Sequence, residues 1–238
     1  MNQKKSFLQT NKLWAVIPAA GSGSRFSKTE LKQYQSILDK TVLEHSVQRL
    51  NQLPLSGYVL AIGEQDNVAK TLDLAEKDKA HFCIGGQERV HSVLNALNYL
   101  IEIASEDDWV FVHDAARPCV SEASLIQLVE TAVSQNTCAI LAIPVRDTLK
   151  SVAEHHQIDK TVSRDHLWQA QTPQIARLGD LKKAIEKALF DNIVITDEAS
   201  ALEYAGHAVK VVQGRADNLK ITYPDDLVLA SLILQSQK

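Results

Sequence analysis

Two basic side chains follow a loop of small residues, an arrangement that can bind phosphate. Segment 14–18, WAVIP, is apolar and predicts a buried strand, and the AAGSGS that follows predicts a loop. Small side chains let backbone N–H groups approach a phosphate closely. Arg25 and Lys32 come next, seven residues apart, and their charges can neutralise a polyphosphate. We therefore expect this segment to bind a nucleoside triphosphate.

The loop matches neither of the two common phosphate-binding motifs. The sequence contains no GxxxxGK[ST]. A dinucleotide-binding motif would need a third glycine where Phe26 stands. The alternative is a purely structural connection after the strand, although the two flanking cations favour phosphate.

A second candidate site residue, Asp114, ends the apolar segment 109–114. A carboxylate at a strand end can hold Mg²⁺ or a ribose hydroxyl, because both suit hard oxygen atoms. The alternative is an ion pair with Arg117 that shapes the loop. We expect His113 to be a packed or hydrogen-bonded histidine rather than a catalytic base.

Gly85 and Gly86 form a third small-residue segment, placed between a predicted strand and a predicted helix. Two glycines permit the close approach of a flat ligand. Ser92 would lie on the first turns of the helix, on the same side as Glu88. A simple strand-to-helix turn, with Glu88 near the positive helix end, explains the pattern equally well.

Further polar residues stand at the edges of short predicted strands, and together they could line a pocket for a phosphorylated polyol. They are Asp147, Arg164, Thr172, Thr196, Asp197 and Lys220. The pair His155 and His156 has no further His or Cys at metal-ligand spacing. We interpret it as an exposed hairpin tip.

Apolar runs alternate with helical patterns along most of the chain. This alternation predicts an α/β fold with a doubly wound, mostly parallel sheet and helices on both faces. Ligands bind beyond the carboxyl ends of the strands in such sheets. Strands are expected at 14–18, 58–62, 81–86, 109–114, 138–144, 209–212 and 219–222. Helices are expected at 41–50, 67–75, 88–104, 121–136, 177–190, 198–205 and, after Pro224, 225–234.

Segment 146–171 breaks this alternation. Its short alternating stretches, 148–153, 161–162 and 167–171, surround a polar middle. This pattern predicts a β-hairpin arm that projects from the domain. A two-stranded ribbon is marginally stable alone in water, so the arm needs a partner surface, and a second copy of the chain is the simplest one.

The composition is that of a globular protein, with 238 residues, 45% hydrophobic residues and a net charge of −4. The negative charge argues against a general nucleic-acid binder. The three cysteines are widely spaced, which favours reduced thiols in a cytoplasmic protein. The polar first dozen residues lack the apolar core of a signal peptide, and no apolar run approaches the ~20 residues that span a bilayer.

Several sequence segments, taken together and in order, resemble the 2-C-methyl-D-erythritol 4-phosphate cytidylyltransferase family of nucleotidyltransferases. The resemblance extends over about residues 14 to 230. The matching segments are PAAGSGSRF, LKQY, EHSV, GGQERVHSV, VHDAARP, PVRDTLK, TPQ, TDEASALEY and GRADNLK.

The resemblance implies one Rossmann-like nucleotidyltransferase domain over residues 1–238, with a β-arm at about 146–171 through which two subunits form a homodimer. It implies transfer of CMP from CTP to 2-C-methyl-D-erythritol 4-phosphate, with Mg²⁺, in the non-mevalonate isoprenoid pathway. A ribitol 5-phosphate cytidylyltransferase is the nearest alternative, and a catalytically silent nucleotide-binding module is another. The set Arg25, Lys32, Asp114 and Lys220 weighs against a silent module but does not separate the two polyols.

The resemblance also implies roles for individual residues. Arg25 and Lys32 would be catalytic, and Asp114 would bind the metal. CTP would contact Pro18, Ala19, Ala20, Gly21, Gly23, Gly86, Gln87, Ser92, Asp114 and Ala115. The polyol phosphate would contact Arg117, Thr148, Arg164, Thr172, Thr196 and Lys220, with Thr148 and Arg164 reaching the partner subunit's site. Some relatives have an acid where Gln87 stands, so the role of residue 87 depends on whether side chain or backbone reads the base.

Overall fold

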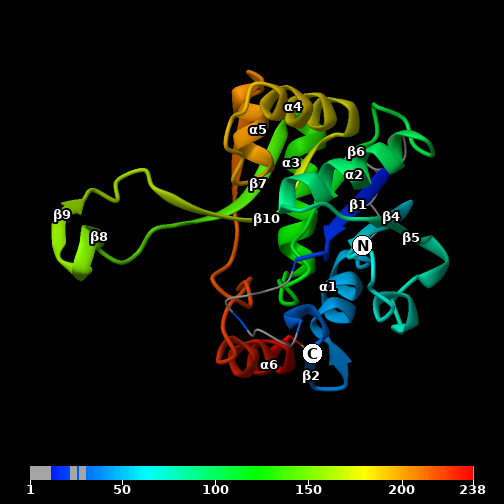
Figure 1. Ribbon diagram of the computed structural model, residues 1–238, viewed down its shortest axis with the longest axis horizontal. Helices are drawn as coiled ribbons and strands as arrows, with labels where there is room; N and C mark the ends of the chain where they lie inside the picture. The colour runs from blue at the N-terminus through cyan, green and yellow to red at the C-terminus, as the bar shows by residue number, and fades with distance from the viewer. Residues whose placement is uncertain (1–11, 22–25, 27–30, 238) are drawn as a thin grey trace.

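A seven-stranded mixed sheet forms the centre of the computed structural model, which describes residues 12–21, 26 and 31–237. The strand order is β11-β7-β10-β6-β1-β4-β5, and neighbouring strands are parallel except where β10 pairs with β6 and β7. This confirms the expected doubly wound, mostly parallel sheet (Figure 1). The strands are β1 (Leu13–Pro18), β4 (Gly57–Ile62), β5 (Ala80–Ile84), β6 (Trp109–Val112), β7 (Cys138–Pro144), β10 (Trp168–Arg177) and β11 (Val209–Gln213).

Helices cover both faces of the sheet, because every strand at its centre is apolar on both sides. In β1, Leu13 and Ile17 belong to the core cluster that includes residues of α1 and α3. The alternate residues Trp14 and Val16 pack in the cluster with α2, α4 and α5. The helices are α1 (Val42–Leu50), α2 (Arg89–Ile101), α3 (Glu122–Gln135), α4 (Leu178–Phe190), α5 (Glu198–Tyr204) and α6 (Asp226–Ser236).

Side-chain caps begin three of these helices at the residues where the sequence changes character. Thr41 accepts a hydrogen bond from the Glu44 N–H and completes a capping box before α1. Ser121 caps α3 by accepting a hydrogen bond from the Ser124 N–H. Asp197 caps α5 and thereby fixes where Glu198, the first residue of that helix, points.

A smaller apolar cluster attaches the C-terminal part of the chain to the end of the sheet. Ile221 and Ala230 pack there against Ala116 and Cys119, which follow β6. The Ile221 N–H also donates to the Ala116 carbonyl oxygen at 2.9 Å. These contacts bring Lys220 beside the carboxyl end of β6.

The segment after β7 leaves the body of the molecule as a thin arm, as expected (Figure 1). Its strands β8 (Leu149–Val152) and β9 (Ile158–Val162) form a separate two-stranded antiparallel sheet, with a short 3₁₀ helix η5 (Glu154–His156) between them. The third predicted strand of the arm is longer than expected. It continues as β10 into the central sheet, where it is antiparallel to both neighbours.

Two expectations about elements are wrong. Segment 67–75 contains only the 3₁₀ helix η3 (Ala69–Thr71), because the Asp66 carboxylate binds the N–H groups of Val68 and Ala69 and closes a tight turn instead. Segment 219–222 is not a strand. The Thr222 N–H donates to the Asp226 side chain rather than to a neighbouring strand.

Two further 3₁₀ helices and one hairpin complete the described chain. The helices are η2 (Lys32–Tyr34) and η4 (Lys77–Lys79), and the hairpin consists of β2 (Ser36–Ile37) and β3 (Lys40–Thr41). None of the helices in the described part of the chain has the length and apolar character needed to span a bilayer.

Candidate active site

A cleft of about 340 Å³ opens beyond the carboxyl ends of β1, β5 and β6, where a doubly wound sheet binds ligands. It gathers segments that are far apart in the sequence. The predicted site residues along it are Pro18, Ala19, Ala20, Gly21, Lys32, Gly86, Gln87, Ser92, Asp114, Ala115 and Lys220. Phe26, Gln33, Glu88, Arg89, Ala116 and Thr222 also line it.

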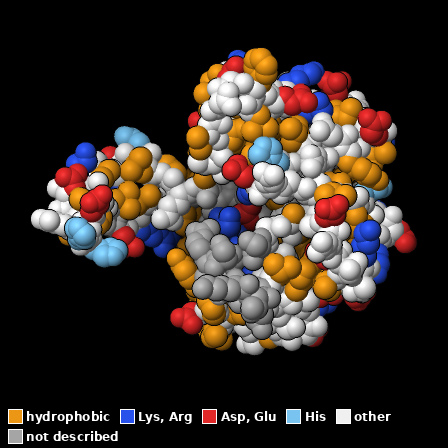
Figure 2. Space-filling model, in the orientation of Figure 1, with side chains coloured by type: hydrophobic (Ala, Val, Ile, Leu, Met, Phe, Trp, Pro, Cys, Tyr) orange, Lys and Arg blue, Asp and Glu red, His pale blue; other side chains and the backbone are white. Residues whose placement is uncertain are grey.

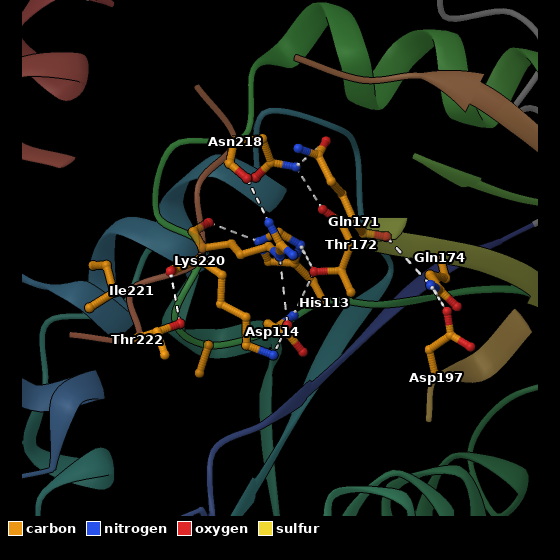
Figure 3. Close-up of polar contacts among 12 residues, drawn as sticks. His113, Asp114, Gln171, Thr172, Gln174, Asp197, Asn218, Lys220, Ile221 and Thr222 are labelled. Carbon is orange, nitrogen blue, oxygen red and sulfur yellow. Dashed lines mark hydrogen bonds and ion pairs between the residues drawn. The ribbon is translucent and has the colours of Figure 1, made fainter. Parts of the chain in front are cut away.

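Asp114 is the carboxylate with the most cationic surroundings in the cleft. Its Oδ2 lies 2.8 Å from Lys220 Nζ, and its Oδ1 lies 2.9 Å from Arg89 Nε (Figure 3 shows the Lys220 contact). Arg117 Nε is 3.6 Å from Oδ2. Burial alone would raise the pKa of Asp114, but the three cations outweigh it and hold the pKa well below its usual range. The carboxylate is therefore ionised at neutral pH.

The ion pair between Asp114 and Arg117 was the structural alternative at this position, and it is present. It does not replace the functional interpretation, because Asp114 also lines the cleft. Arg117 itself lies behind the carboxylate, where its Nη1 donates to the Asn218 carbonyl oxygen at 2.6 Å. This contact ties the end of β6 to the segment that carries Lys220.

His113 and Thr172 support Asp114 from inside the sheet. The Thr172 hydroxyl oxygen accepts a hydrogen bond from the Asp114 N–H at 3.0 Å and lies 3.2 Å from His113 Nδ1 (Figure 3). Burial lowers the pKa of His113 from 6.5 to about 4, so the imidazole is neutral. His113 is a buried, hydrogen-bonded residue, as expected.

The glycine turn after β5 forms one wall of the cleft. A Cβ atom on Gly85 would lie 2.4 Å from the Ala20 Cβ, so a side chain there would push the two turns apart. The Ser92 hydroxyl oxygen accepts a hydrogen bond from the Gly86 N–H at 2.9 Å. Ser92 thus holds the turn from the first part of α2.

Lys32, a predicted catalytic cation, also lines the cleft and lies close to the segment of Lys220, a predicted substrate-binding cation. Its Nζ donates to the Ile221 carbonyl oxygen at 3.1 Å, one residue after Lys220. The neighbouring Gln33 is buried and donates to the Ala19 carbonyl oxygen at 2.9 Å. Gln33 therefore links the turn after β1 to η2, a role that the sequence pattern did not indicate. Arg25 and Gly23 lie outside the described residues.

Several predicted residues are not among the described residues that line the cleft. Thr148 and Arg164 are exposed on the arm, where Arg164 donates to the Arg146 carbonyl oxygen. Thr196 is exposed before α5, whereas Thr172 and Lys220, two other residues expected around the polyol phosphate, both contact Asp114. Asp197 accepts a hydrogen bond from Gln174 Nε2 at 2.9 Å (Figure 3).

Arg89 and Glu198 are polar residues of the site that sequence reasoning did not select. Arg89 Nη1 is 2.6 Å from Glu198 Oε1, and Arg89 Nη2 is 3.1 Å from Glu198 Oε2. Both residues occur in segments that carry the family resemblance, GGQERVHSV and TDEASALEY. The sequence did offer one indication of this pair: the two residues have opposite charges and stand at the starts of two predicted helices.

The donor set of the cleft fits a magnesium ion that arrives with a nucleotide. Mg²⁺ is usually held by one or two carboxylates together with substrate phosphates and waters. Asp114 supplies such a carboxylate at the cleft wall. Within the described residues, no group of three or more His, Cys, Asp or Glu side chains could hold a metal ion alone. The phosphates would therefore have to supply the remaining ligands.

The chain is similar to named proteins and to solved structures along nearly its whole length. Residues 13–236 match the family model described as 2-C-methyl-D-erythritol 4-phosphate cytidylyltransferase. The protein of that name from Acinetobacter baumannii is 73% identical over 226 residues, 95% of each chain, and that from Vibrio cholerae is 47% identical over 229 residues, 96% of this chain and 98% of the other. The solved structure of the Francisella tularensis protein of that name has a TM-score of 0.81 and 40% identity, and the match covers 94% of this chain and 100% of the other.

The fold, the cleft and these similarities together define the protein as a nucleotidyltransferase. Its sheet order places the polar residues of the cleft beyond the carboxyl ends of the strands, where open α/β sheets bind ligands. The chain belongs to the 2-C-methyl-D-erythritol 4-phosphate cytidylyltransferase family.

Proposed function

We propose that this chain transfers CMP from CTP to 2-C-methyl-D-erythritol 4-phosphate. The products are 4-diphosphocytidyl-2-C-methyl-D-erythritol and pyrophosphate, in the non-mevalonate isoprenoid pathway. An oxygen of the polyol phosphate attacks the α-phosphorus of CTP, and the bond from that phosphorus to the pyrophosphate oxygen breaks. The attacking oxygen is already ionised at pH 7, so the reaction needs neither a general base nor a covalent enzyme intermediate.

The main obstacle to this reaction is the repulsion between two polyanions, and cations are the remedy. Lys32 can offset the charge that develops at the α-phosphoryl group, with Arg25 in the same role. Lys220 can hold the attacking phosphate in line with the bond that breaks. The observation that carries the proposal is that Lys32 and Lys220 line one cleft together with the glycine turns. Lys32 is also tied to the segment that carries Lys220, because its Nζ donates to the carbonyl oxygen of the next residue, Ile221.

CTP would occupy the part of the cleft between the turn after β1 and the turn after β5. Ala19, Ala20 and Gly21 line one side, and Gly86 and Gln87 line the other. The small residues leave space for the triphosphate, and the second turn would recognise the cytosine. The role of Gln87 in recognising cytosine depends on whether its backbone or its side chain contacts the base.

The proposed metal is Mg²⁺, held by Asp114 and by the triphosphate. When bound, it would offset charge on the pyrophosphate that leaves. Asp114 contributes an ionised carboxylate because its pKa lies well below the usual range. Its backbone is fixed by Thr172, so the carboxylate starts from a defined position.

We also propose that two chains form a homodimer through the arm, with Thr148 and Arg164 acting at the partner's cleft. The exposed arm supports this proposal. Val152, Ile158 and Trp168 are 51%, 59% and 42% exposed, and Figure 2 shows apolar side chains gathered on the visible side of the arm. A free two-stranded ribbon with such side chains gains stability when a partner covers it.

The nearest competing function uses ribitol 5-phosphate as the second substrate. The test is turnover with CTP and each polyol phosphate in turn, measured as pyrophosphate release. The proposal expects kcat/KM for methylerythritol phosphate to exceed that for ribitol phosphate by at least about a hundredfold, since a site built for particular hydroxyls rejects analogues that leave its polar groups unpaired. The opposite preference would assign the chain to the ribitol reaction. No pyrophosphate with either polyol would indicate a silent nucleotide-binding module.

The proposed place of action is the cytoplasm. Cys83, Cys119 and Cys138 all carry free thiols. Cys119 and Cys138 are buried, and burial raises the pKa of Cys119 to about 12. Unreactive, reduced cysteines suit a reducing compartment.

A further inference from the structure

Arg89 connects two carboxylates that come from different parts of the chain. It is the first residue of α2, and Glu198 is the first residue of α5. Two nitrogens of the guanidinium reach the two Glu198 oxygens at 2.6 and 3.1 Å, and the third, Nε, reaches Asp114 Oδ1 at 2.9 Å. Because the guanidinium is planar and rigid, the bidentate contact with Glu198 sets the direction from which Nε meets Asp114.

The position of Arg89 is not explained by the stability of its own helix. A cation at the N-terminus of a helix is unfavourable, because that end carries a partial positive charge. The first turn of α2 has no acidic residue, and the side chain of its acidic N-cap residue, Glu88, makes no cap hydrogen bond. The two carboxylates from β6 and α5 provide the balance, and both are almost completely buried.

Without Glu198, positive charges would outnumber negative charges around Asp114. Three cations, Arg89, Arg117 and Lys220, surround the single Asp114 carboxylate. Glu198 adds a second negative charge, and its two oxygens are both directed at Arg89. Glu198 is 3% exposed and is not among the described residues that line the cleft. Its contact with the cleft runs through Arg89, which lines the cleft and binds Asp114.

We propose that Arg89 and Glu198 are a positioning pair that holds the Asp114 carboxylate in the orientation that binds CTP and its Mg²⁺. This inference rests on the function proposed above, in which Asp114 contacts the nucleotide and the metal. Glu198 keeps Arg89 in place and neutralises it, so that Asp114 retains negative charge toward the cleft. Neither residue of the pair takes part in bond making or breaking.

The test measures CTP affinity by calorimetry in the presence of Mg²⁺ and without the polyol phosphate, so that no turnover occurs. Glu198→Gln removes the charge with little change of shape. Arg89→Lys keeps the charge but loses the rigid fork. Each change is expected to weaken CTP binding by roughly tenfold to a hundredfold, as substitutions behind metal ligands do.

Glu106→Gln is the matched control, because it removes the same charge from an ion pair, with Lys183, outside the cleft. It should leave CTP affinity as in the parent. If Glu198→Gln and Arg89→Lys leave CTP affinity at the level of this control, the positioning role is wrong.

Asp114→Asn separates the inference from the function on which it rests. If the pair acts through Asp114, Glu198→Gln should cause little further loss of affinity when Asp114 is already Asn. If the losses multiply independently, the pair does not act through Asp114 and the inference fails. If Asp114→Asn alone leaves Mg²⁺-dependent CTP binding unchanged, the proposed role of Asp114 fails, and the inference fails with it.

A last variant separates positioning from a role in folding alone. Removing only Arg89 would leave Glu198 buried and unpaired, which is strongly destabilising. Arg89→Met combined with Glu198→Met replaces the pair by apolar side chains of similar length, a change that folded proteins often tolerate. The double variant is expected to unfold near the parent's temperature and still bind CTP at least tenfold more weakly. Parental affinity in the folded double variant would show a purely structural role.

Discussion

The cleft and the arm carry predicted site residues in opposite structural settings. In the cleft, the key carboxylate is 7% exposed and contacts cations from three segments of the chain. On the arm, Thr148 and Arg164 are exposed. A cleft residue is held by the packed sheet around it, whereas an arm residue has only a two-stranded ribbon behind it. The cleft is therefore organised within one chain, whereas in the proposed dimer the arm residues would act at a second chain's cleft.

The largest expected effect is at Lys32, on the cleft side of this comparison. Lys32→Ala should lower kcat by about a hundredfold to a thousandfold with little change in the KM for CTP, because the charge acts on the transition state. Steady-state kinetics of pyrophosphate release measures both constants. A raised KM with an unchanged kcat would mean that Lys32 binds the ground state and the transition state equally.

The second prediction tests whether the arm completes another subunit's site. Arg164→Ala alone should be strongly impaired, but mixing it with the impaired Lys32→Ala variant should restore activity. In each mixed dimer one site has both intact residues, so equal mixing should return about a quarter of the parental activity. No recovery, once mixed dimers are demonstrated by mass spectrometry, would contradict the shared site.

The third prediction concerns pH and the buried support of the cleft. The folded-state pKa of His113 is lowered to about 4, so the unfolded chain binds the additional proton between pH 6.5 and 4. Stability is therefore lost as the pH falls through this range, by about 3 kcal/mol from this residue. Chemical denaturation at several pH values should show a shallower pH dependence for His113→Gln. Equal slopes for the two proteins would contradict it.

The smallest expected effect is on the arm. Val152 and Ile158 are opposite each other in the β8–β9 pair. Replacing both by Ser should weaken the dimer by about 2 kcal/mol, roughly thirtyfold in Kd, with no change in CTP affinity. Sedimentation and calorimetry measure the two quantities. Val68→Ser is the control, because Val68 is an exposed apolar residue outside the arm. A loss of CTP affinity in the arm variant would contradict the view that the cleft binds CTP independently of the arm.

Sequence patterns predicted most of the sheet and most of the helices, because the central strands are apolar and the helices have clear periodicity and caps. Ser121 and Asp197, residue types that favour the start of a helix, cap α3 and α5. The errors fall where local side-chain bonds replace regular structure, as at Asp66 and Asp226. Such bonds depend on side-chain geometry that the hydrophobic pattern does not record.

The sequence by itself determined the class of fold, the family and the strand ends from which the cleft is built. Those properties follow from apolar periodicity and from residue types at fixed spacing along the chain. Only the tertiary structure decided that Arg89 joins Asp114 to Glu198, 109 residues away from Arg89, and that Lys32 meets Ile221 across 189 residues. Contacts between such distant residues depend on how strands are ordered and packed, and that order is absent from any local pattern.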